Sequence, residues 1–212
     1  MFIQAMNYQL VLDKMLEEIK AENKKPTLLL HVCCAPCSTY VLEYLSDYFT
    51  ITLYYYNPNI FPREEYNKRL QVLLQFVQEL KSNHRPVIEE ANYDPAEFYR
   101  NIKGLENEKE GGDRCKKCYA LRLEEAARKA AEKSLDYFTT TLSISPLKNA
   151  QLINDLGVVY ENKYGVRYLY ADFKKKEGYK RSIALSKQYG LYRQDYCGCE
   201  FSMKNKRKNE TD

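Results

Sequence analysis

Apolar residues recur at helical spacing near the N-terminus and then fall into short runs separated by amphipathic stretches. Residues 8–20 place apolar side chains three and four positions apart, which predicts an amphipathic helix. The segments TLLLHV (27–32) and TITLYYY (50–56) have the composition of buried strands. The stretch STYVLEYLSDY between them has helical spacing, with Ser38 available as its N-cap. A strand, a helix and a strand in this order predict a parallel βαβ unit.

The same alternation continues along the chain. Strands are predicted at 85–90, 136–142 and 166–173, and helices at 64–82, 119–133, 147–165 and 181–190. We therefore expect the α/β fold class, as one catalytic domain over residues 1–203 with a Rossmann-like, mostly parallel sheet and helices on both faces. Residues 204–212 are basic and polar, and we expect them to form a disordered tail.

Length and composition limit the class of protein. A chain of 212 residues can bury a core without disulfides. The N-terminal residues lack the pattern of a secretory signal, and no apolar run is long enough to span a membrane. We therefore expect a cytoplasmic protein without a membrane partner, in which clustered cysteines indicate metal or redox chemistry rather than a disulfide framework.

All seven cysteines of the chain fall in three short motifs. HVCCAPC holds Cys33, Cys34 and Cys37, CKKC holds Cys115 and Cys118, and CGC holds Cys197 and Cys199. Cysteines that served only as small apolar residues would be scattered through the predicted strands and helices. The first motif also follows the first predicted strand directly, at the edge where open α/β sheets bind ligands. The pattern therefore indicates a metal or redox site at this edge.

Two of the motifs together offer four sulfur ligands. Cys33, Cys34, Cys115 and Cys118 would suit a tetrahedral zinc or a [4Fe–4S] cluster, and a metal-free dithiol is a third possibility. Position favours the cluster, because these residues join distant segments of a sizeable domain, whereas structural zinc usually staples small folds. The CGC pair is different, since a disulfide between Cys197 and Cys199 would close a small strained ring suited to redox cycling. The alternative is that this pair binds a second metal together with Cys37.

Charged residues and histidines are the remaining candidates. Asp113 beside CKKC and Asp195 beside CGC either donate protons near the site or serve as turn and capping residues. We expect His31 to be a core histidine and His84 to lie in a loop. The sequence contains no phosphate-loop, dinucleotide-binding or serine-hydrolase motif.

The net charge of +4 is unevenly distributed, with much of the excess in DFKKKEGYKR (172–181) and KNKRKN (204–209). Basic stretches of this kind suit a polyanion such as tRNA, and they are also typical of solvated loops.

Five segments, in one order, resemble the QueH family of epoxyqueuosine reductases over about residues 27 to 203. They are LLLHVCCAPCS, YYYNPNIFPREEYNKR, GGDRCKKCYALRL, FTTTLSISPLKN and YGLYRQDYCGCEFS. The resemblance implies a fold similar to the adenine-nucleotide α-hydrolase (HUP) architecture. It also implies a cytoplasmic enzyme that reduces the epoxide of epoxyqueuosine at the tRNA wobble position, the last step of queuosine biosynthesis.

The family resemblance further implies a set of cofactors. A [4Fe–4S] cluster would be held at Cys33, Cys34, Cys115 and Cys118. The CGC pair would be either a redox-active disulfide or ligands near an additional iron. Where some members of the family carry aspartate, this sequence has Cys37, which makes Cys37 a candidate ligand of that iron.

Partners follow from the same resemblance. We expect tRNA carrying epoxyqueuosine to be bound through phosphate contacts from Lys174, Lys175, Lys176, Lys180 and Arg181. We also expect an external low-potential electron donor, because the dinucleotide fingerprint is absent. Two other functions are consistent with the residues: an iron–sulfur or persulfide-dependent tRNA sulfur transferase, and a non-catalytic zinc module that binds nucleic acid.

Overall fold

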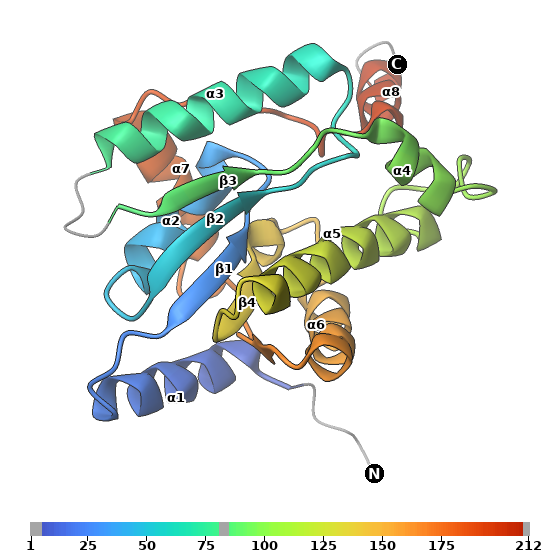
Figure 1. Ribbon diagram of the computed structural model, residues 1–212. Coiled ribbons are helices and arrows are strands. Elements are labelled where there is room, and N and C mark those ends of the chain that lie inside the picture. The colour runs from blue at the N-terminus through green and yellow to red at the C-terminus, as the bar shows by residue number, and fades with distance from the viewer. Residues whose placement is uncertain (1–5, 81–84, 210–212) are drawn as a thin grey trace.

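A five-stranded parallel sheet forms the centre of the molecule (Figure 1). The computed structural model describes residues 6–80 and 85–209. The strands are β1 (Thr27–His31), β2 (Thr50–Tyr55), β3 (Val87–Glu90), β4 (Tyr137–Thr140) and β5 (Arg167–Tyr168). Their order in the sheet is β3-β2-β1-β4-β5, and each neighbouring pair is parallel. This is the doubly wound order of Rossmann-like proteins, and it confirms the expected α/β class.

Helices cover both faces of the sheet, with α2, α3 and α7 on one side and α5 and α6 on the other (Figure 1). The helices are α1 (Tyr8–Ala21), α2 (Ala35–Leu45), α3 (Arg63–Glu79), α4 (Pro95–Asn101), α5 (Asp113–Glu132), α6 (Ala150–Tyr164), α7 (Gly178–Gln188) and α8 (Glu200–Asn209), and a 3-10 turn, η1 (Thr141–Ile144), follows β4. Strand β1 is buried from both sides, since Leu28 and Leu30 join one apolar core and Leu29 the other. No helix among the described residues is long and apolar enough to cross a membrane.

Three helices begin at least three residues earlier than the sequence predicts, and two of these differences involve cysteines. Helix α2 begins at Ala35 with Cys34 as its N-cap, so Ser38 is not the cap. The Ser38 hydroxyl lies inside the helix and donates to the backbone oxygens of Cys34 and Ala35. Helix α5 begins at Asp113, so the CKKC motif, which precedes the helix predicted at 119–133, forms its first turns.

Two other expectations need correction near the C-terminus. The strand predicted at 166–173 ends at Tyr168, because the side chain of Asn154 takes the place of a neighbouring strand and its Oδ1 accepts from the Ala171 backbone nitrogen. Helix α8 runs to Asn209, six residues into the segment that we expected to be a disordered tail. Its first turn is supported by an ion pair between Glu200 and Lys204, one helical turn apart. Residues 210–212 lie outside the described part of the chain.

Candidate metal and redox site

Cys33, Cys34 and Cys37 form a compact group, here called the thiol triad, beyond the carboxyl end of β1. Their sulfur atoms all lie within 4.8 Å of one another, and the Cys33 and Cys34 sulfurs are 3.8 Å apart. The early start of α2 creates this geometry, because it turns the chain directly after Cys34 and places Cys37 in the first helical turn. Three sulfurs at this spacing can ligate one metal ion or metal cluster.

The three thiols differ in acidity. Hydrogen bonds from Cys34 and Cys37 hold the pKa of Cys33 well below its usual range. Burial raises the pKa of Cys34 to about 12, and the neighbouring Cys33 raises that of Cys37. The triad therefore favours one thiolate, at Cys33, stabilised by two thiols. Gln194 adds a contact from the segment after α7, since its Nε2 donates to the Cys34 sulfur at 2.8 Å.

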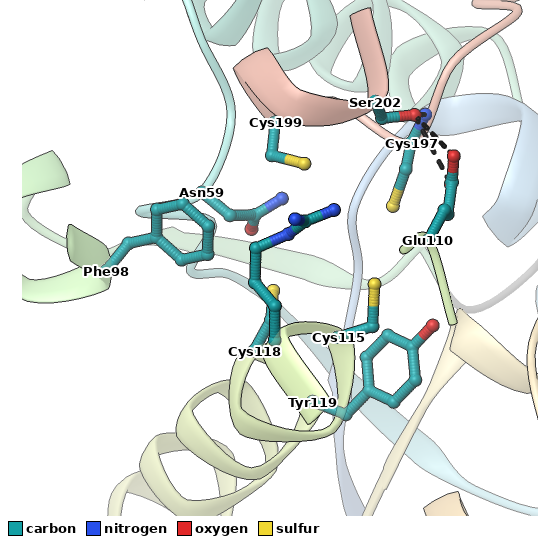
Figure 2. A pocket seen from close by; sticks show the side chains of 10 residues that line it. Asn59, Phe98, Glu110, Cys115, Cys118, Tyr119, Cys197, Cys199 and Ser202 are labelled. Carbon is teal, nitrogen blue, oxygen red and sulfur yellow. Dashed lines mark hydrogen bonds between the residues drawn. The ribbon is translucent and has the colours of Figure 1, made fainter. Parts of the chain in front are cut away.

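The other four cysteines line one pocket, here called the thiol pocket (Figure 2). Its walls are formed by Asn59, Phe98, Glu110, Arg114, Cys115, Cys118, Tyr119, Cys197, Cys199 and Ser202. Figure 2 shows the sulfurs of Cys115 and Cys118 facing the pocket from α5, and those of Cys197 and Cys199 facing it from the segment that enters α8. Burial raises the pKa of Cys118 to about 11 and that of Cys199 to about 12.

The CGC segment is held in place by α3. Arg69 is only 1% exposed, and it pairs with Glu65 at 2.7 Å while its Nη1 donates to the Cys197 carbonyl at 3.3 Å. The Phe61 backbone nitrogen donates to the Gly198 carbonyl at 2.8 Å. Gly198 has a φ of +124°, a conformation that side chains strongly disfavour. Glycine is therefore needed between the two cysteines to hold them in this position.

Buried cations link the thiol triad to the thiol pocket. Arg122 lies one turn after Cys118 on the same face of α5, is 1% exposed and forms no ion pair with a described carboxylate. The thiols of Cys118, Cys197 and Cys33 interact electrostatically with its guanidinium and raise its pKa against the effect of burial. These thiols come from all three cysteine motifs. Because a buried charge without a counter-ion costs several kcal/mol, Arg122 favours negative charge on the surrounding sulfurs.

Unpartnered polar atoms surround the same region. Among the described residues, the buried side-chain nitrogen and oxygen atoms without a hydrogen-bond partner belong to Asn57, Asn59, Arg69, Arg114, Arg122, Thr141 and Gln194. Most of these residues touch the cysteine motifs or line the thiol pocket. Buried polar groups are nearly always paired in folded proteins, so this concentration indicates a site built around a bound group.

The predicted four-ligand set is divided between the two sites. Cys33 and Cys34 lie with Cys37 in the triad, whereas Cys115 and Cys118 lie with the CGC pair. All seven cysteines are free thiols in the structure.

The two predicted proton donors lie beside these motifs. Asp113 begins α5 with its carboxylate exposed and paired with Lys116 at 2.7 Å, which lowers its pKa. Asp195 lies in the segment that leads to Cys197.

The predicted tRNA-binding residues are mostly paired with carboxylates. The ion pairs are Lys174 with Asp172, Lys176 with Asp13, Lys180 with Glu177, and Arg181 with Glu43. Lys175 is exposed and has no ion pair with a described residue. The local excess of positive charge is therefore smaller than the sequence indicates.

His31 is a core histidine, as predicted. Its Nε2 donates to the Tyr56 carbonyl at 3.0 Å, and its Nδ1 accepts from the Thr140 hydroxyl at 2.8 Å. Burial lowers its pKa to about 4, so the ring stays neutral and joins the ends of β1 and β4. The other histidine, His84, lies outside the described residues.

Sequence reasoning missed three residues of the site. Arg122 had a readable signal, because it is a charged residue on the buried face that Cys115 and Cys118 begin. Lys148 was assigned to a helix, yet it lies in the loop before α6, half-buried and close enough to interact with the Cys197 and Cys33 thiols. Asn59 follows β2 and had no signal beyond that of a turn residue.

The doubly wound sheet and the thiols gathered at its carboxyl edge define a class: a cysteine-rich α/β protein with a candidate metal or redox centre. Comparison with known proteins is more specific. A family model described as epoxyqueuosine reductase QueH matches residues 28–205. The chain belongs to the QueH family of epoxyqueuosine reductases, and it is an enzyme of the oxidoreductase class.

Individual relatives carry the same name, epoxyqueuosine reductase QueH. The relative from Streptococcus pyogenes serotype M1 is 46% identical over 203 residues, which cover 95% of this chain and 80% of the relative. The relative from Staphylococcus epidermidis is 46% identical over 203 residues, covering 94% and 85% of the two chains. The relative from Thermotoga maritima is 35% identical over 186 residues, covering 88% and 95%. Family membership thus extends over nearly the whole chain.

Proposed function

We propose that this protein reduces the epoxide of epoxyqueuosine, at the wobble position of tRNA, to the alkene of queuosine. The names of its relatives support this substrate, and one observation carries the chemistry: three distant cysteine motifs meet around the buried cation Arg122. The reaction consumes two electrons and two protons and releases water. An external low-potential donor supplies the electrons, because the sequence has no dinucleotide motif. The reaction takes place in the cytoplasm, where thiols stay reduced.

A [4Fe–4S] cluster held by Cys33, Cys34, Cys115 and Cys118 is part of this proposal. The donor set fits in kind, because it offers four soft, buried sulfur ligands, and Arg122 interacts with a thiol from each of the two groups into which they fall. The charge fits as well, since the negative charge of a thiolate-bound cluster would partner Arg122. When bound, the cluster supplies one-electron transfer at low potential.

The CGC pair works beside these ligands, since it shares the thiol pocket with Cys115 and Cys118. Two roles suit its position. Cys197 and Cys199 either cycle between dithiol and disulfide or ligate an additional iron, for which Cys37 is a further candidate ligand.

Lys148 places a positive charge beside the cysteine sulfurs, where negative charge develops on the epoxide oxygen during the reaction. Although burial opposes its charge, the thiols of Cys197 and Cys33 raise the pKa of Lys148, so its ammonium group stays protonated. Anionic sulfurs alone would repel the negative charge that develops on the epoxide oxygen as its carbon–oxygen bond breaks. An ammonium group among them stabilises that charge.

Nucleoside analysis of tRNA tests the proposed function. In a bacterium that lacks its own reductase, we expect the parent gene to convert epoxyqueuosine to queuosine, and Cys197→Ser and Cys199→Ser to leave epoxyqueuosine in place. No conversion by the parent gene would favour the zinc-binding module over the redox enzyme, and full conversion by both variants would refute the role of the CGC pair. A thiolated nucleoside in place of queuosine would favour the sulfur transferase.

A further inference from the structure

Asn59 presents an unpaired carboxamide to the thiol pocket. The residue lies in the turn after β2, is 2% exposed and is one of the pocket-lining residues in Figure 2. Neither its Nδ2 nor its Oδ1 has a hydrogen-bond partner among the described residues. An amide that loses its water on folding and gains no partner destabilises the fold, so such groups are rare away from binding sites.

Another buried asparagine shows what a purely structural role requires. Asn154 is fully buried, and its Nδ2 donates to the carbonyls of Ala150 and Ala171 at 2.7 and 2.9 Å. Its Oδ1 accepts from the Ala171 backbone nitrogen at 3.0 Å. The carboxamide of Asn154 is thus used at both ends within the fold. That of Asn59 is used at neither end, which points to a partner that is not part of the fold.

The chemistry of the pocket indicates what that partner is. Four of its walls are cysteine sulfurs, and Phe98 forms an apolar wall. The Glu110 carboxylate accepts a hydrogen bond from the Ser202 hydroxyl. The four sulfur atoms are the most numerous acceptors in the pocket that the Asn59 amide lines, and they carry negative charge once they bind a metal. Hydrogen bonds to the sulfurs of an iron–sulfur group are one of the factors that set its reduction potential.

We propose that Asn59 is a positioning residue that donates a hydrogen bond from Nδ2 to a thiolate or sulfide sulfur of the metal centre. This inference rests on the proposed function, because it requires an iron–sulfur group at the cysteines. The hydrogen bond withdraws negative charge from the sulfur, so it makes the reduced state of the centre easier to reach. Leucine has nearly the same shape as asparagine and removes both polar atoms.

Asn59→Leu should have opposite effects on the metal-free and the iron-loaded protein. Without metal, the variant unfolds at a higher urea concentration than the parent, because it no longer buries two unpaired polar atoms. With iron, it holds as much iron per chain as the parent, and its midpoint potential is more negative. Asn154→Leu is the matched control: it unfolds at a lower urea concentration, since it breaks a paired network, and when loaded its potential equals that of the parent.

The proposal is overturned by an equal midpoint potential in iron-loaded parent and Asn59→Leu. It is also overturned if the metal-free variant is less stable than the metal-free parent, because the amide would then have a partner within the fold. Should Asn59→Leu fail to fold, Asn59→Ala tests the potential with the same expected sign. A parent protein that takes up no iron refutes the proposed function and this inference together, whereas a loaded parent with an unshifted variant refutes this inference alone.

Discussion

Gly198 lets the backbone pass close to Arg69 between the two cysteines of the CGC motif. A Cβ atom at this position would lie 2.9 Å from Arg69 Nη1 and 3.1 Å from Ile60 Cγ1. Arg69 cannot move away freely, because it is buried and paired with Glu65. Gly198 thus determines the position of the Cys197 and Cys199 thiols relative to the rest of the site.

Gly198→Ala should therefore lower both stability and activity. We expect the free energy of unfolding to fall by about 1–3 kcal/mol, since alanine is strained at this φ and its methyl group meets Arg69. Urea unfolding and initial rates of epoxyqueuosine reduction measure the two effects. Gly104→Ala is the control, because Gly104 has a φ of +84° with no neighbour within 4 Å. Equal loss of activity in both variants would contradict the close-approach argument.

At the residue scale, the cysteines were readable from the sequence and their surroundings were not. Clustering in three motifs marked every thiol of the site, because cysteine is rare and chemically specific. Arg122 and Asn59 have ordinary spacing in a helix and a turn. Their importance comes from buried polar atoms, Nη2 of Arg122 and both polar atoms of the Asn59 amide, that have no hydrogen-bond partner among the described residues. Burial of that kind depends on which segments pack together in the fold, and a local sequence pattern carries no information about that packing.

At the scale of elements, Asp136 ties the start of β4 to the start of β1. Its Oδ2 accepts from the Thr27 backbone nitrogen at 2.8 Å and from the Thr27 hydroxyl at 2.7 Å. The Asp136 backbone nitrogen donates back to the same hydroxyl at 2.9 Å. The hydrogen bonds from Thr27 lower the pKa of the Asp136 carboxyl below its usual value of 3.8.

Asp136→Ala should destabilise the fold at neutral pH by about 1 kcal/mol, the usual value for a hydrogen bond that stays close to solvent. Because the pKa is lowered on folding, this contribution is complete above the usual pKa and is lost as the pH falls through the folded value. Urea midpoints of parent and variant should therefore converge in acid. Asp136→Asn keeps the acceptor without the charge, so its difference from the parent should also shrink in acid. A difference in urea midpoint between the parent and Asp136→Ala that stays constant from neutral to acid pH would contradict this account.

Most elements could be predicted because their patterns are local. Strand β1 is an apolar run, and α1 and α3 have clear amphipathic spacing. The early starts of α2 and α5 were missed because neither has a side-chain cap that a sequence could show. Strand β5 was overestimated because its ladder is replaced by the Asn154 side chain, a contact between residues 17 positions apart.

At the scale of the whole molecule, binding of tRNA should depend on few lysines of the predicted basic stretch. Lys175→Ala should weaken tRNA binding and reduce the dependence of affinity on salt by about one charge. Lys180→Ala is the matched control and should have a smaller effect, because Glu177 already compensates its charge. Filter binding or fluorescence anisotropy over a range of salt concentrations measures both. Equal losses of affinity would show that the ion pairs open when tRNA binds.

The alternation of strands and helices predicted that the sheet is parallel. It did not predict the order of the strands, which is known only from the structure. The same limit applies to the site. The sequence placed HVCCAPC at the carboxyl edge of the sheet, and the structure adds that α5 and the segment before α8 bring the other two motifs to the same region. It also groups the thiols as a triad and a pocket, a division that spacing alone could not show.

One measurement tests the central claim most directly: iron content and absorption of protein purified without oxygen, followed by its reaction with epoxyqueuosine-containing tRNA and a chemical reductant. We expect brown protein with about four irons per chain or slightly more, and conversion of epoxyqueuosine to queuosine. Colourless protein that holds one zinc, takes up no iron on anaerobic reconstitution and leaves epoxyqueuosine unchanged would contradict the account.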